Sequence, residues 1–182
     1  MGFSVFILDY RGYGKSQGKA SEKGTYHDAE AAMNYLTRQR NIAENNISVF
    51  GRSLGGPVAA YVTTKYSISA LILESTFSSA PDMASRVVPW PIFPLRLLSR
   101  YSYNTAKRLE SINCPVLVIH SPDDEIIPFS HGEKLYHAAK QPKVFLQIRG
   151  GHNDGFLLSG ESYTNGLREF VSGISNKAPL HR

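Results

Sequence analysis

The sequence predicts an α/β fold in which a mainly parallel sheet is flanked by helices. Several short runs are rich in Val, Ile, Leu or Phe and lack a clean alternation with polar residues, which is typical of strands buried on both faces. These runs are residues 3–8, 47–50, 70–73, 116–120 and 144–148. Helical spacing between the runs favours alternating strands and helices with parallel neighbours. The 182 residues, 42% of them hydrophobic, are enough for one domain with a substantial core.

Helices are expected between and after these strands. They cover residues 21–40, 54–66, 130–139 and 161–174. In the first, Tyr26, Ala29 and Met33 are spaced as on one face of a helix. Ser21 precedes them as a candidate N-cap. In the second, Pro57 falls in the first turn, where a missing amide hydrogen costs no intrahelical bond.

The expected organisation is a single domain over residues 1–182 with a tail at 175–182. Residues 77–108 are long for a simple crossover and carry several prolines among Met, Leu, Phe and Trp. Two interpretations stay open for this segment. It forms a lid or cap insertion with an apolar underside, or it forms a pair of helices that covers the sheet.

Composition excludes several function classes. The lone Cys114 rules out an intrachain disulfide, and no run of about 18 apolar residues predicts a transmembrane helix. The N-terminus lacks the basic flank of a signal peptide, so we expect a cytoplasmic or membrane-peripheral protein. The net charge of +5 fits either a basic face toward an anionic membrane or an ordinary solvated surface. No nucleic-acid-binding module is recognisable, and oligomeric state is unreadable.

A serine motif follows the second apolar run. The letters G-R-S-L-G at residues 51–55 match G-x-S-x-G between a predicted strand and a predicted helix, the context that a nucleophile elbow requires. The tight turn predicts a strained backbone at Ser53 and a need for glycine at both 51 and 55. The Leu54 amide, at the helix N-terminus, is then a candidate oxyanion donor. The alternative is a glycine-rich turn with a spectator serine.

Candidate partners of this serine lie on two later loops. Residues 121–128 follow the fourth apolar run and contain three adjacent carboxylates, among them Asp124. His152 follows the fifth run, after two glycines that leave it free to swing over Ser53. The three loops share one edge of a parallel sheet, which is the arrangement for Ser–His proton transfer with a carboxylate orienting the imidazole. His27, His131 and His137 are expected at the surface.

These motifs together resemble the α/β-hydrolase superfamily. The markers are D-Y-R-G-Y-G-K-S at 9–16, G-R-S-L-G-G at 51–56, H-S-P-D-D-E-I-I-P at 120–128 and G-G-H-N-D at 150–154. They span most of the chain in the family's order. Their form is similar to the branch of membrane-linked serine hydrolases that includes yeast bud-emergence-type proteins and protein depalmitoylases. In that family's pattern the acid corresponds to Asp124 rather than Asp123.

The resemblance implies a three-layer α/β-hydrolase-type fold and a mechanism. Ser53, His152 and Asp124 would form a catalytic triad that cleaves acyl esters or thioesters of small or lipid-like substrates, with no cofactor and no metal. Leu54 and Tyr10 would line the oxyanion and substrate site. The resemblance also implies roughly three further strands before residue 9, so the fold would lack its first strands and the usual second oxyanion donor. Without them, residues 3–8 either pair directly with the serine strand or leave edges unpaired. The alternatives are a non-catalytic remnant or binding module, and a serine peptidase.

Overall fold

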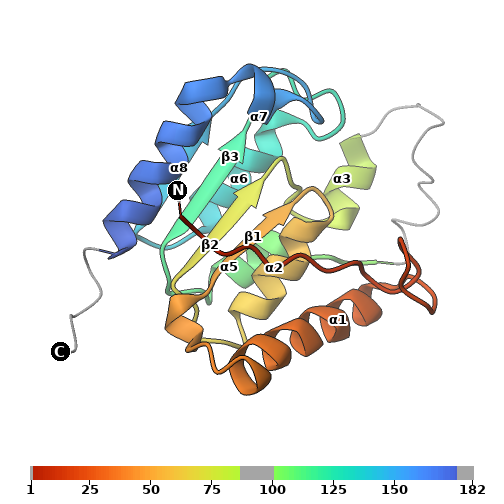
Figure 1. The fold of residues 1–182 in the computed structure, drawn as a ribbon. Coiled ribbons are helices and arrows are strands. Elements are labelled where there is room, and N and C mark those ends of the chain that lie inside the picture. Colours follow the sequence, from red (N-terminus) through yellow and green to blue (C-terminus); the bar gives the residue numbers. More distant parts are fainter. Residues whose placement is uncertain (1, 87–100, 176–182) are drawn as a thin grey trace.

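A four-stranded parallel sheet forms the centre of the structure, a computed structural model that describes residues 2–86 and 101–175 (Figure 1). The strands are β1 (Ser48–Arg52), β2 (Ala70–Glu74), β3 (Val116–His120) and β4 (Lys143–Gln147). They lie side by side in chain order, and each pair of neighbours is parallel. The predicted α/β architecture is therefore confirmed.

The helices of the described residues precede, separate and follow the strands. They are α1 (Glu22–Asn34), α2 (Gly55–Thr63), α3 (Ala80–Arg86), α5 (Thr105–Leu109), α6 (Phe129–Ala138), α7 (Gly155–Leu158) and α8 (Gly160–Ser175). All but three short ones (α3, α5 and α7) fall close to a predicted position. A π-helical turn (Tyr35–Gln39) extends α1, and a 3-10 turn (Glu44–Asn46) precedes β1. No helix in these ranges is long and apolar enough to cross a membrane.

Alternating side chains of the central strands build a core on each face of the sheet. Leu71 and Leu73 of β2 pack with residues of α2, α5 and α6, because right-handed crossovers between strands in chain order place their helices on one face. Ala70 and Ile72 point to the other face, where α8 supplies Leu167 and Phe170. The result is the predicted three-layer arrangement, with α8 on the opposite face of the sheet from α2, α5 and α6 (Figure 1).

The first helix is fixed by its cap and by its contact with α2. Ser21 Oγ accepts a hydrogen bond from the Gly24 amide at 3.1 Å, which confirms the predicted cap. The ring of Tyr26 stacks on that of Tyr61 in α2, with centroids 4.2 Å apart. The D-Y-R-G-Y-G segment is anchored to the same helix, since Arg11 forms an ion pair of 2.7 Å with Asp28.

The prediction of a strand at residues 3–8 is wrong. Residues 2–10 have no regular secondary structure, and the side of β1 away from β2 carries no strand among the described residues. Val5 and Ile7 are 78% and 84% exposed. A strand needs a neighbour to complete its ladder of hydrogen bonds, and the direct pairing with β1 considered above does not form. The edge of β1 is therefore unpaired within these ranges.

The predicted lid and tail are described only in part. Helix α3 and helix α5 belong to the predicted lid segment, whereas residues 87–100 lie outside the described residues. Of the predicted tail, residues 176–182 also lie outside them. Both interpretations of residues 77–108 therefore stay predictions.

Candidate active site

Three loops at the carboxyl edge of the sheet bring together Ser53, Asp124 and His152. Ser53 follows β1, Asp124 lies in the loop between β3 and α6, and His152 lies in the loop between β4 and α7. Because all four strands are parallel, their carboxyl ends meet at one edge, and side chains from distant parts of the sequence converge there.

The turn at Ser53 has the strained backbone that the motif predicts. Ser53 adopts a φ of 51°, in the left-handed region that non-glycine residues rarely occupy. Its amide donates to the Glu74 carbonyl at 3.0 Å, and its carbonyl accepts from the Thr76 hydroxyl at 2.6 Å and from the Gly56 amide at 3.0 Å. These bonds hold the strained conformation in place.

The steric need for glycine differs from the prediction. A Cβ at Gly51 would lie 2.5 Å from the Gly55 carbonyl oxygen, so this glycine is required. A Cβ at Gly55 would meet only the Tyr10 hydroxyl, at 3.8 Å, and the predicted collision there is wrong. Instead, a Cβ at Gly56 would collide with the Thr76 side chain. The close approach lies one residue further into α2 because the helix packs against the segment after β2.

These contacts predict opposite outcomes for two alanine substitutions in the same motif. Gly51→Ala is expected to destabilise the fold by about 2–3 kcal/mol, because backbone atoms of the facing turn must move. Gly55→Ala is expected to leave stability unchanged or to raise it by up to about 1 kcal/mol, since alanine favours the helix. Urea unfolding of the two variants beside the wild type measures both effects. An equal loss in both variants would contradict this account of the turn.

A continuous chain of hydrogen bonds links the three side chains. Ser53 Oγ lies 3.1 Å from His152 Nε2, and His152 Nδ1 lies 2.9 Å from Asp124 Oδ2. Asp124 Oδ1 accepts from the amides of Ile127 at 2.7 Å and Ile126 at 3.0 Å. Burial alone would raise the pKa of Asp124, but the bonds from His152 and these amides outweigh burial and hold the pKa below the usual value of an aspartate. An ionised Asp124 therefore faces His152 at neutral pH.

The two glycines before His152 shape the turn that carries the imidazole. Gly150 has a φ of 90°, which turns the chain after β4. A Cβ at Gly151 would lie 2.5 Å from Glu125 Oε2, so this glycine permits a close approach to the loop between β3 and α6, here called the acid loop. The Gly151 amide also donates to Asp154 Oδ1 at 2.7 Å. The glycines therefore permit the backbone turn and the close contact with Glu125 that place His152 beside Ser53.

The remaining histidines separate into buried and exposed groups. His27 and His137 are exposed, as predicted. The prediction of a surface position for His131 is wrong, because this side chain is fully buried and its Nδ1 accepts from the Ser78 amide at 3.2 Å. His120 is buried at the end of β3, where its Nε2–H donates to the Ile127 carbonyl at 2.9 Å. His120 thus supports the loop that carries Asp124.

Leu54 and Tyr10 lie beside the serine turn. Leu54 is the N-cap of α2, and its amide is used by none of the hydrogen bonds found among the described residues. The hydroxyl of Tyr10 faces the start of the same helix at Gly55. Burial is the main cause that raises the pKa of Tyr10 to about 12, and the nearby Tyr103 and Asp28 raise it further. Both groups are therefore hydrogen-bond donors at neutral pH.

Sequence reasoning missed the charged residues around the His152 loop. Arg52 and Glu74 end neighbouring strands, and Glu125 directly follows Asp124. The only sequence signal for a role of Arg52 is its position inside the G-x-S-x-G motif at 51–55. The only one for Glu125 is its position inside the acidic stretch at 120–128. Glu74 ends a buried apolar strand, and nothing in its local sequence indicates a partner.

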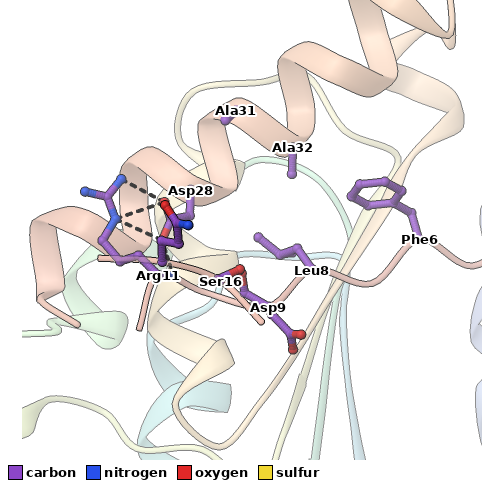
Figure 2. Close-up of a pocket in the computed structure, with 9 residues that line it drawn as sticks. Phe6, Leu8, Asp9, Arg11, Ser16, Asp28, Ala31 and Ala32 are labelled. Atoms are coloured by element: carbon purple, nitrogen blue, oxygen red, sulfur yellow. Dashed lines mark hydrogen bonds and ion pairs between the residues drawn. The ribbon is translucent and has the colours of Figure 1, made fainter. Parts of the chain in front are cut away.

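A cavity of about 340 Å³ lies away from these side chains. It opens between the N-terminal segment, with Phe6 and Leu8, and the α1 face that carries Ala31 and Ala32 (Figure 2). None of Ser53, Asp124 and His152 lines it. Across the described parts of the chain, no three His, Cys, Asp or Glu side chains gather closely enough to hold a metal ion.

The α/β-hydrolase class is defined by a strained serine at a strand-to-helix turn. In this class a loop with an acidic residue and a loop with a histidine follow later in the chain and meet the serine at the same sheet edge. A family model for the alpha/beta hydrolase fold matches residues 1–110, and the chain belongs to this family, as predicted.

Similar proteins include one named alpha/beta hydrolase domain-containing protein WAV2 from Arabidopsis thaliana. It is 40% identical over 185 residues, covering 92% of this chain and 60% of the relative. An uncharacterized protein of Mycobacterium tuberculosis is 38% identical over 173 residues, covering 94% of this chain and 61% of the relative. This chain therefore spans about 60% of the length of these curated relatives. An esterase structure from Pyrococcus furiosus has the same fold, with a TM-score of 0.74 at 19% identity, covering 91% of this chain and 68% of that one.

Proposed function

We propose that this chain is a serine hydrolase that cleaves acyl ester or thioester bonds through an acyl-enzyme intermediate. The observation that carries the proposal is the hydrogen-bonded chain from Ser53 Oγ through His152 to Asp124, with distances of 3.1 and 2.9 Å. A serine hydroxyl is a weak nucleophile by itself, and an adjacent base oriented by a carboxylate is the arrangement that activates it.

In the proposed reaction, Ser53 Oγ attacks the acyl carbon of the substrate while His152 Nε2 takes the hydroxyl proton. Asp124 accepts a hydrogen bond from His152 Nδ1–H and stabilises the imidazolium that forms. The bond from the acyl carbon to the leaving oxygen or sulfur then breaks, and His152 returns its proton to the leaving group. A water molecule, deprotonated by His152, releases the carboxylic acid and regenerates Ser53.

The negative charge that develops on the acyl oxygen must be stabilised by hydrogen-bond donors close to that oxygen. The Leu54 amide stands at the N-terminus of α2, where the partial positive charge of the helix collects. We assign the second donation to the protonated hydroxyl of Tyr10, which faces the start of the same helix.

The proposal predicts that a fluorophosphonate probe labels one residue of this protein. Ser53 Oγ displaces fluoride from phosphorus, and the proton passes to His152. Because Ser53 directly follows Arg52, trypsin releases it at the start of the peptide that ends at Lys65. Mass spectrometry is expected to find the phosphonyl group on Ser53 within that peptide.

Two other outcomes would count against the proposal. A folded wild-type protein that the probe does not label supports the alternative of a binding module without turnover. Labelling at another serine would move the nucleophile elsewhere. To separate an esterase from a peptidase, p-nitrophenyl esters and matching p-nitroanilides are compared. The proposal expects turnover of the esters without detectable cleavage of the anilides, whereas cleavage of the anilides would support the peptidase alternative.

A further inference from the structure

We propose that Arg52 and Glu125 are positioning residues that hold the main chain of His152 from its two sides. This inference rests on the proposed function, because it concerns how the imidazole is kept aligned with Ser53 and Asp124. Neither residue contacts the reacting atoms in the proposed scheme. Each acts through the backbone of the histidine loop.

Glu125 holds the amino side of His152. The His152 amide donates to Glu125 Oε2 at 2.9 Å, a hydrogen bond between a backbone donor and a charged acceptor. The absence of a side chain at Gly151 lets the carboxylate approach this closely, since a Cβ there would lie 2.5 Å from Oε2. The acid loop therefore touches the histidine loop twice, through Asp124 on the ring and through Glu125 on the backbone.

Arg52 holds the carboxyl side of His152. The Nη2 atom of the guanidinium donates to the His152 carbonyl oxygen and lies 3.5 Å from Asn153 Oδ1. The guanidinium carbon also lies 5.7 Å from the ring centre of Phe156 in α7. Because Arg52 precedes Ser53 in the chain, the backbone that carries the proposed nucleophile is tied directly to the loop that carries the proposed base.

The arginine is itself held by a buried carboxylate. Arg52 Nε lies 3.2 Å from Glu74 Oε1, an ion pair whose alignment falls short of a hydrogen bond. Glu74 is only 2% exposed, and its Oε2 accepts a 2.5 Å hydrogen bond from the Tyr163 hydroxyl of α8. Burial and the bond to Glu74 raise the pKa of Tyr163, which keeps the hydroxyl protonated as a donor. The contacts therefore run from α8 through β2 and β1 to the histidine loop.

This double attachment has a kinetic consequence. His152 must present Nε2 to Ser53 and Nδ1 to Asp124 at the same time, so a shift of its backbone disturbs both bonds. A misplacement of about 1 Å costs on the order of 10²-fold in rate in well-aligned reactions. Loss of either attachment should therefore lower kcat and leave KM nearly unchanged, since neither residue is assigned to substrate binding.

Pairs of variants separate a hydrogen-bonding role from a purely electrostatic one. Glu125→Ala is expected to lower kcat on a p-nitrophenyl ester by about 10- to 100-fold. Glu125→Gln, which keeps an acceptor oxygen but not the charge, is expected to retain most of the wild-type kcat.

Arg52→Met should lower kcat by as much as Glu125→Ala. Tyr163→Phe removes only a hydroxyl and should produce a smaller loss in the same direction. Glu133→Ala and Arg40→Met are matched controls at exposed positions, and they should behave as the wild type.

A spectroscopic measurement tests the attachment without turnover. The proton between His152 Nδ1 and Asp124 is expected as a downfield NMR resonance, assigned by its absence in His152→Gln. Glu125→Ala and Arg52→Met should shift or broaden it, whereas the controls should not. Thermal unfolding of every variant identifies those that fail to fold, and the conservative Glu125→Gln and Tyr163→Phe variants keep the test decisive in that case.

The results distinguish this inference from the proposed function. An inactive wild type that retains the resonance contradicts the proposed function, while the NMR comparison still decides whether the residues hold the loop. An active wild type whose Glu125→Ala and Arg52→Met variants keep both kcat and the resonance overturns the positioning roles. A loss in Glu125→Gln as large as in Glu125→Ala overturns the role assigned to Glu125, because the charge and not the hydrogen bond would then explain the effect.

Discussion

A Ser53→Ala variant is expected to lose about 10⁶-fold in kcat toward p-nitrophenyl esters. The substitution removes the proposed nucleophile and leaves His152 with no hydroxyl to deprotonate. Any remaining turnover would come from water and from the oxyanion donors. Initial rates at saturating ester, with the wild type measured beside it, test this expectation over a range that exceeds any effect of binding alone.

The fold should survive this substitution, which makes the kinetic result interpretable. The turn at residue 53 is held by its backbone bonds to Glu74, Thr76 and Gly56, whereas within the described part of the chain its side chain bonds only to His152. Ser67→Ala, at an exposed position in the loop after α2, serves as the control. If Ser53→Ala keeps ester hydrolysis within tenfold of the wild type, the nucleophile is another group.

The central fold and the three converging loops could be predicted because their signals are local. Strands β2 and β3 are buried along their whole length, and their continuous apolar runs predict this directly. A parallel sheet then dictates that the loops after its strands meet at one edge. Motif and topology together are therefore enough to predict that Ser53 lies near His152 and Asp124.

Residues 3–8 show where local signals fail. Their composition matches that of the true strands, yet they form none in the structure, because a strand depends on a neighbour that its own sequence does not specify. Similarly, β1 and β4 each have only one neighbour within the described residues, and their side chains are only partly buried. An apolar run indicates that a segment favours a strand, but whether the strand forms depends on hydrogen bonding to a neighbouring strand.

The supporting residues could not be predicted for a different reason. The contacts of Glu74 with Arg52 and with Tyr163 join three elements whose mutual positions follow only from packing. The close approach of Gly56 to Thr76 likewise depends on how α2 packs against the segment after β2. A motif names the residues that do chemistry in its family, but it does not name the residues that keep them aligned.

The assignment of Asp124 as the proposed acid gives the second large prediction. Its side chain is fully buried and accepts bonds from His152 and from two backbone amides. An asparagine can satisfy those amides only with its carbonyl oxygen, so its NH₂ group must face His152 Nδ1. The imidazole then carries its proton on Nε2 and cannot accept the proton of Ser53.

Asp124→Asn is therefore expected to lower kcat by about 10⁴-fold while the fold remains intact, because the substitution preserves shape and reverses one hydrogen bond. The neighbouring Asp123 is exposed, and Asp123→Asn should retain nearly full activity. Steady-state kinetics of the two variants on one ester, with unfolding midpoints as a check, distinguish the carboxylates. Equal losses in both, or a larger loss in Asp123→Asn, would contradict the role assigned to Asp124. The comparison also probes the tautomer of His152, since an effect of this size requires the asparagine to hold the imidazole with its proton on the wrong nitrogen.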